Sequence, residues 1–130
     1  MDYTRQIKLD VNPESVPSVV HIKQGDRYSR FIRIQLMKDG VNFTPESGVK
    51  FIFRCQRSDG AAVTEDSTTY ITSLGRYLVT NLGSGLIQIE LNDDALAVPG
   101  RCWCDLCLQK NEQTLSTDPF VMEVVFSPAQ

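Results

Sequence analysis

The chain has 130 residues, of which 42% are hydrophobic and 22% are charged. This composition excludes a disordered tail, a collagen-like fibre and a coiled coil. Thirteen basic residues stand against sixteen acidic ones, which gives a net charge of −3 at pH 7. Because nucleic-acid binders of this size are usually basic, the charge argues against a nucleic-acid partner. We expect one domain over residues 1–130, with its core at about 5–126.

The sequence predicts neither insertion into a membrane nor secretion. A membrane helix needs about 20 consecutive apolar residues, whereas the longest apolar stretches here are only a few residues long. Residues 1–6 are polar and lack the basic start and apolar core of a signal peptide. We therefore expect synthesis in a reducing cytoplasm, where the cysteines stay as thiols.

Apolar and polar side chains alternate along most of the chain, which is typical of strands with one buried face. The first example is Ile7, Leu9 and Val11, which are separated by Lys8 and Asp10. In chain order, strands are expected at residues 7–11, 19–23, 31–38, 49–56, 76–80, 87–91, 102–109 and 120–126.

Turn-forming residues occupy the breaks between these segments. Residues 38–40 (Lys-Asp-Gly) and 58–60 (Ser-Asp-Gly) are the strongest hairpin signals, because Asp and Gly tolerate the positive φ of a tight turn. The polar residues 64–69 predict a loop, and one short helical turn is expected near 92–97, where acidic residues suit a helix start. Together these features predict an all-β fold, an antiparallel β-sandwich of about seven to nine strands.

The cysteines do not have the pattern of a metal site. A zinc site needs four ligands in a tetrahedron, whereas strand parity places Cys107 on the face opposite to Cys102 and Cys104. Cys55 or His21 would have to be recruited to complete such a site. We therefore predict no metal site, with Cys102 and Cys104 as small core residues and Cys107 as a surface thiol.

His21 is the only histidine, so a hydrolase triad or an acid–base pair would have to be built around it. In a strand, His21 points to the side opposite to Val20 and Ile22, which predicts a position on the surface. Residues 83–85 (Gly-Ser-Gly) do not open a helix, so a phosphate-binding loop is not indicated. We predict no catalytic residue, no cofactor and no enzymatic activity.

The expected strands at residues 31–38 and 49–56 carry basic and apolar side chains at positions that point away from the core. If these strands lie side by side, the side chains form one patch that suits a protein interface; the alternative is a fully solvated face. The candidate interface residues are Phe31, Arg33, Lys50, Ile52 and Arg54.

The order and spacing of the strand and turn segments are also informative. The relevant segments are residues 7–11, 20–26, 31–40, 49–60, 85–91, 99–100, 116–120 and 123–124. In this order they resemble the N-terminal domain of phage baseplate upper proteins, from tailed phages of Gram-positive hosts. The resemblance covers about residues 5–126 and implies an immunoglobulin-like sandwich that is not an enzyme. It implies attachment to the tail tip, and it transfers no functional residue to this chain.

The first functional hypothesis is therefore a structural module of a phage or prophage tail baseplate. Such a module docks on other tail proteins, helps to present host-recognition proteins, and can form a homo-oligomer in the assembly. It is made and assembled in the host cytoplasm and resides in the virion tail, with no nucleic-acid partner and no membrane insertion. The alternative is a carbohydrate- or peptide-binding β-sandwich, for which Tyr28, Tyr70, Tyr77 and Trp103 are the candidate aromatic residues. A third hypothesis is a small metalloprotein or enzyme built on the cysteine cluster.

Overall fold

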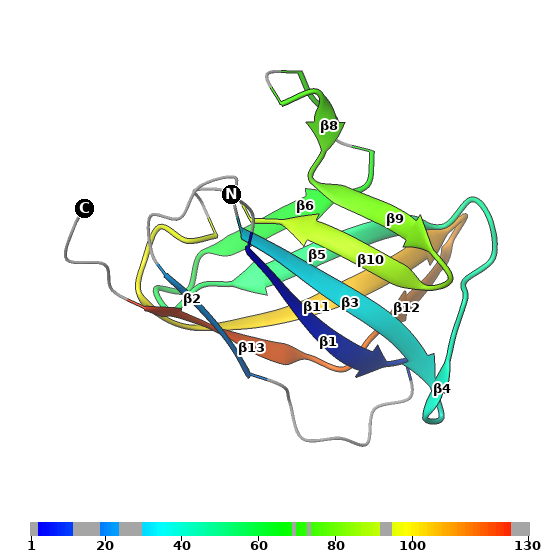
Figure 1. Ribbon diagram of the computed structural model, residues 1–130, viewed down its shortest axis with the longest axis horizontal. Coiled ribbons are helices and arrows are strands. Elements are labelled where there is room, and N and C mark those ends of the chain that lie inside the picture. The colour runs from blue at the N-terminus through cyan, green and yellow to red at the C-terminus, as the bar shows by residue number, and fades with distance from the viewer. Residues whose placement is uncertain are drawn as a thin grey trace.

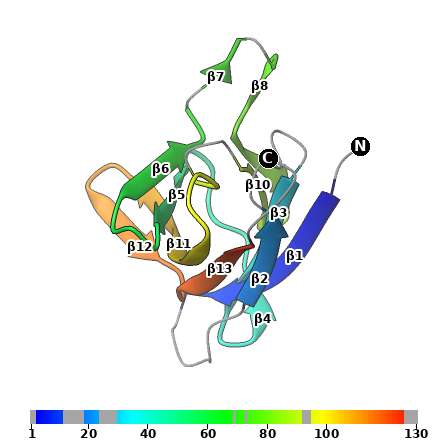
Figure 2. The ribbon, with the colours of Figure 1, turned by 90° about the vertical axis from the view of Figure 1, so that its left-hand side faces the viewer.

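The computed structural model describes residues 3–11, 19–23, 30–68, 70–72, 74–91 and 95–125. These residues form thirteen β-strands and no helix, and hence no helix that could cross a membrane. Two large sheets face each other across a shared apolar core (Figure 1), and the prediction of an all-β sandwich is confirmed. Figure 2 shows β1 and β3 on one side of the molecule and β5, β6, β11 and β12 on the other.

The two large sheets are called sheet A and sheet B. Sheet A has the order β1 (Tyr3–Asp10), β3 (Arg30–Lys38), β10 (Leu86–Glu90) and β9 (Val79–Gly83), with β4 (Val41–Asn42) paired to β3. Sheet B has the order β2 (Val19–Lys23), β13 (Phe120–Val125), β11 (Gly100–Lys110), β5 (Lys50–Gln56) and β6 (Ala62–Asp66), with β12 (Gln113–Ser116) paired to β11. A small third sheet pairs β7 (Tyr70–Ile71) with β8 (Arg76–Tyr77) and projects from the sandwich (Figure 1).

Most strand pairs are antiparallel, as predicted, but β1 pairs with β3 and β2 pairs with β13 in parallel. A parallel neighbour requires a crossover connection rather than a hairpin. Alternation inside one strand is the same for both kinds of pairing, so the sequence pattern cannot distinguish them.

The core follows the alternation closely. Ile32, Ile34 and Leu36 of β3 are fully buried on the inner side of sheet A. Phe53 of β5 lies on the inner side of sheet B, and its ring stacks on that of Phe120 with the centroids 6.2 Å apart. The inward side chains of the other long strands complete the same apolar cluster. Burial of such side chains contributes roughly 1.5–3 kcal/mol each, so the alternation is the main source of stability of the fold.

The turns at residues 38–40 and 58–60 form as predicted and connect β3 to β4 and β5 to β6. Asp39 and Gly40 both have positive φ, at 53° and 81°. Gly85, between β9 and β10, also has positive φ, and a Cβ at this position would collide with the backbone oxygen of Phe43. Only glycine therefore fits where this turn meets the segment after β4.

Some local predictions need correction, and one lies partly outside the described residues. Residues 64–66 belong to strand β6 rather than to a loop, because pairing with β5 supplies the order that their polar pattern does not suggest. Residues 92–94, in the expected helical turn near 92–97, lie outside the described residues, and residues 95–98 form a turn and bends without a helix. The expected strand 76–80 is divided between β8 and β9, and β4, β7 and β12 were not predicted.

Candidate protein interface

The outer surface of sheet B is the first candidate for an interaction surface. Along each strand of this sheet, outward side chains alternate with core residues, and the register places Val19, Val121, Trp103 and Gln56 in a row across β2, β13, β11 and β5. We call this outer surface the sheet-B face. Its central residues that reach solvent are Val19, Arg101, Trp103, Asp105, Arg54 and Thr64, whereas Val121 is buried.

Trp103 is the most unusual residue of the sheet-B face, since 53% of it is exposed to solvent. A shallow cavity of about 320 Å³ lies beside its indole and is also lined by Arg54, Thr64 and Pro119. Large side chains such as Trp bury much apolar area when a partner covers them, and they dominate the binding energy of many protein interfaces. Trp103 and this cavity therefore give the face a centre that a partner protein could cover.

The charged side chains of the sheet-B face are paired with one another. Arg54 makes a two-pronged contact with Asp105, with Nε–Oδ1 and Nη2–Oδ2 distances of 2.8 and 2.6 Å. The hydrogen bond to Asp105 raises the pKa of Arg54. Two further ion pairs on this face are Arg101–Glu123 at 3.3 Å and Lys50–Asp66 at 3.7 Å. Because each cation has a carboxylate beside it, these pairs create no basic patch suited to phosphate groups.

The five predicted interface residues do not form one patch. β3 lies in sheet A and β5 lies in sheet B, so the premise that their strands are neighbours is wrong. Their outward parities are correct, but they point to opposite sides of the sandwich. Phe31 and Arg33 belong to the outer side of sheet A, and Phe31 is only 7% exposed. Lys50, Ile52 and Arg54 belong to the sheet-B face.

Cys107 also differs from the prediction. Its thiol has outward parity, as expected, but the residue is only 3% exposed, so the predicted surface thiol is wrong. Arg54 on β5 reaches across β11 and donates a 3.1 Å hydrogen bond to Ser116 Oγ on β12. Ser116 is the neighbour of Cys107 in the strand register. The guanidinium group therefore crosses the strand beside Cys107 and helps to cover it.

The other three cysteines form a buried thiol cluster under the sheet-B face. Cys55 of β5 is the register partner of Cys104 on β11, and Cys102 lies two residues before it. A hydrogen bond with Cys102 lowers the pKa of Cys55, but the hydrogen bond with Cys104 and burial together raise it to about 12. The pKa of Cys102 is raised by its hydrogen bond with Cys55 and by burial. Within the described residues no group of side chains has an arrangement that could hold a metal ion, and the three thiols pack as core residues.

His21 is exposed on β2, so its predicted surface position is confirmed. The aromatic residues considered for sugar binding do not form one platform. Tyr70 and Tyr77 contact each other edge to face in the projecting β7–β8 hairpin, with ring centroids 5.0 Å apart, whereas Trp103 belongs to sheet B. Tyr28 lies outside the described residues.

Sequence reasoning considered Trp103 only as a sugar-binding candidate. The signal that could have placed it at an interface was available in its neighbours. Trp103 stands between two cysteines that point into the core, so its own side chain points outward. A tryptophan that points outward from the middle of a long strand is expected to be exposed, as it is here.

The described residues thus form an all-β sandwich whose exposed, charge-balanced face suits contact with another protein. The chain belongs to the N-terminal domain family of the phage baseplate proteins called BppU, since the family model described as BppU N-terminal domain matches residues 2–128. Among solved structures, the N-terminal domain of phage TP901-1 ORF48 is similar in fold, with a TM-score of 0.66. It is 18% identical, and the similarity covers 93% of this chain and 97% of that one. A comparison with curated proteins finds no significant match.

Proposed function

We propose that this chain is a non-enzymatic structural module of a phage or prophage tail baseplate, which docks on other tail proteins and helps to present host-recognition proteins. The observation that carries the proposal is the family match, which spans residues 2–128. In this proposal the chain acts as one sandwich domain, is assembled in the host cytoplasm and resides in the virion tail, where it can contact further copies of itself.

We further propose that docking uses the sheet-B face. Trp103 supplies a large, half-exposed apolar group, and the paired charges around it can be covered without leaving a single charge unmatched. Matched charges matter because an unpaired buried charge would cost several kcal/mol in the complex. Lys50, Ile52 and Arg54, from the predicted patch, belong to this docking surface.

The location can be tested by immunogold electron microscopy of phage particles that carry the protein. We expect gold label at the tail tip, and intact tails without label would contradict the baseplate assignment.

The docking surface can be tested in the same particles with Trp103→Glu, which places a charge at the centre of the sheet-B face. We expect this variant to fold and to be lost from the tails. Leu82→Glu is the matched control, because Leu82 is 45% exposed on β9 of the other sheet. Equal incorporation of both variants would contradict docking through the sheet-B face while leaving the location untouched.

A further inference from the structure

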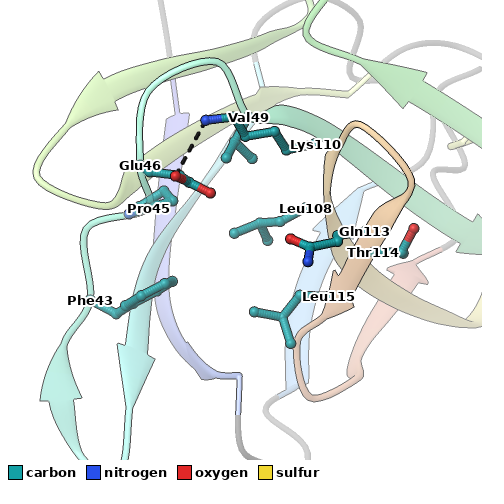
Figure 3. Close-up of a pocket in the computed structure, with 9 residues that line it drawn as sticks. All are labelled: Phe43, Pro45, Glu46, Val49, Leu108, Lys110, Gln113, Thr114 and Leu115. Carbon is teal, nitrogen blue, oxygen red and sulfur yellow. Dashed lines mark ion pairs between the residues drawn. The ribbon is translucent and has the colours of Figure 1, made fainter.

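An apolar groove opens at the end of the sandwich, away from Trp103. It has a volume of about 430 Å³ and lies between the segment after β4 and the β11–β12 hairpin. Figure 3 shows Phe43 and Pro45 on one side and Leu108 and Leu115 on the other. Leu115 is 42% exposed, although it is the register partner of Leu108 and points to the same inner side of sheet B. The inner side of β12 is therefore only partly covered by the sandwich.

The wall of this groove is held in place by polar contacts. Lys110 Nζ lies 3.3 Å from the Glu46 carboxylate (Figure 3). It also donates a 2.9 Å hydrogen bond to the backbone oxygen of Ser47. These contacts tie the segment after β4 to the β11–β12 hairpin. The groove is thus formed in advance, and a ligand would not have to order it.

The strand beside the groove has an open edge. The backbone N–H of Thr117 donates a hydrogen bond to the carbonyl of Leu106. In an antiparallel ladder, every second residue pair is joined by backbone hydrogen bonds, so the pair Leu115–Leu108 is also hydrogen-bonded. The N–H and C=O groups of Thr114 and Ser116 then point away from β11. No other strand of the described residues pairs with that edge of β12.

We propose that β12 and this groove bind an extended segment of another protein, which adds to sheet B as a further strand. The main chain of the segment would bond to Thr114 and Ser116, and its inward side chain would enter the groove beside Leu115 and Phe43. Because strand side chains alternate, the segment has a large apolar residue at that position and polar residues on either side of it.

The chemistry of the groove favours a peptide over the other ligand classes. A sugar would need an exposed aromatic ring, but Phe43, the one aromatic residue among the described residues that line the groove, is half-buried. An anion would need a free cation, whereas Lys110 is already bonded to Glu46 and Ser47. An open strand edge, by contrast, supplies donors and acceptors with the spacing of a peptide main chain.

The test is an NMR titration of the full chain with a synthetic peptide of about six residues, in which threonine alternates with isoleucine. We expect shifts of the amide signals of β12 and of residues 43–49. The control peptide has the same sequence with N-methyl groups on alternate residues, which prevents strand pairing, and it should bind roughly tenfold more weakly.

Two variants address the edge and the groove separately. Thr114→Pro removes an N–H that points to the open edge without removing a bond to β11, and it should weaken binding by up to about tenfold. Ala62→Pro is its matched control on β6, the opposite edge of sheet B, where the N–H also points away from the neighbouring strand, and it should bind normally. Leu115→Lys leaves the backbone intact and should weaken binding roughly tenfold, which keeps the proposal testable if Thr114→Pro does not fold.

Three results would overturn the proposal. The first is the absence of shifts in β12 at saturating peptide, and the second is unchanged binding by both Thr114→Pro and Leu115→Lys. The third is a concentration-dependent shift of the same amides without peptide, which would identify the occupant as a second copy of this chain. None of these results bears on the tail-tip location or on Trp103, because the groove and the sheet-B face are tested by different variants.

Discussion

Outward side chains of the two sheets follow the same alternating sequence pattern, but single positions differ widely in exposure. On sheet A, Phe31 is 7% exposed and Glu90 is 2% exposed, although both have outward parity. On sheet B, Trp103 is 53% exposed, and the side chain of Arg54 is 47% exposed. Parity therefore decides which side of a sheet a residue faces, and what packs on that side decides whether it is buried.

Polar contacts show how the outer side of sheet A is covered near Glu90. Arg76, the first residue of β8, binds Glu90 through two hydrogen bonds of 2.6 and 3.0 Å. Arg33 on β3 donates a 3.0 Å hydrogen bond to Gln88 on β10. The pairs on the sheet-B face stay near solvent instead, so a partner can still reach the apolar surface between them.

The largest expected difference between the two sides concerns their aromatic residues. Phe31→Ala should lower the free energy of unfolding by about 3 kcal/mol, because it removes a ring that is almost completely buried. Trp103→Ala should change it by no more than about 1 kcal/mol, because half of that residue is already in solvent. Urea denaturation of both variants measures the difference, and equal losses would contradict the proposed contrast between the two sides.

Ion pairs give the next contrast. Arg76→Ala leaves the Glu90 carboxylate buried without its cation and should destabilise the protein by about 2–3 kcal/mol. Arg54→Ala breaks a pair whose members stay hydrated and should cost only about 0.2–1 kcal/mol. The two variants can be compared by thermal unfolding, and a larger loss for Arg54→Ala would reverse our interpretation.

The buried thiols under the sheet-B face predict a dependence on pH. The pKa of Cys55 is about 12 in the folded chain and near 9.0 when unperturbed, so the unfolded chain loses this proton first as the pH rises. The stabilising contribution of the protonated thiol is complete below about pH 9 and is lost as the pH rises towards 12. Unfolding free energies in reducing buffer should fall over this range, and Cys55→Ala should reduce the slope; an identical slope in the variant would contradict the assignment.

The smallest expected effect concerns Cys107. Because Arg54 crosses β11 beside this residue, Arg54→Ala should expose the thiol and raise its rate of reaction with a disulfide reagent severalfold. Lys50→Ala removes a charge from the same strand without touching Ser116 and serves as the control. If both variants react at the rate of the unchanged chain, Arg54 does not protect Cys107.

The sequence was sufficient to predict the sandwich, most long strands and the inward side of β11, because these depend on local alternation. It could not predict that β3 and β5 lie in different sheets, since strand order depends on crossovers between distant segments. It also could not predict the burial of Cys107, which depends on Arg54 from another strand. The polar strand β6 was missed for a similar reason, because only its pairing with β5 makes it a strand.

The most direct test of the docking proposal is hydroxyl-radical footprinting of Trp103 in isolated phage tails and in the free chain. If the module docks through the sheet-B face, oxidation of Trp103 should fall severalfold in tails, while oxidation of Tyr77 provides an internal reference outside that face. Equal oxidation of Trp103 in tails and in the free chain would contradict docking through the sheet-B face.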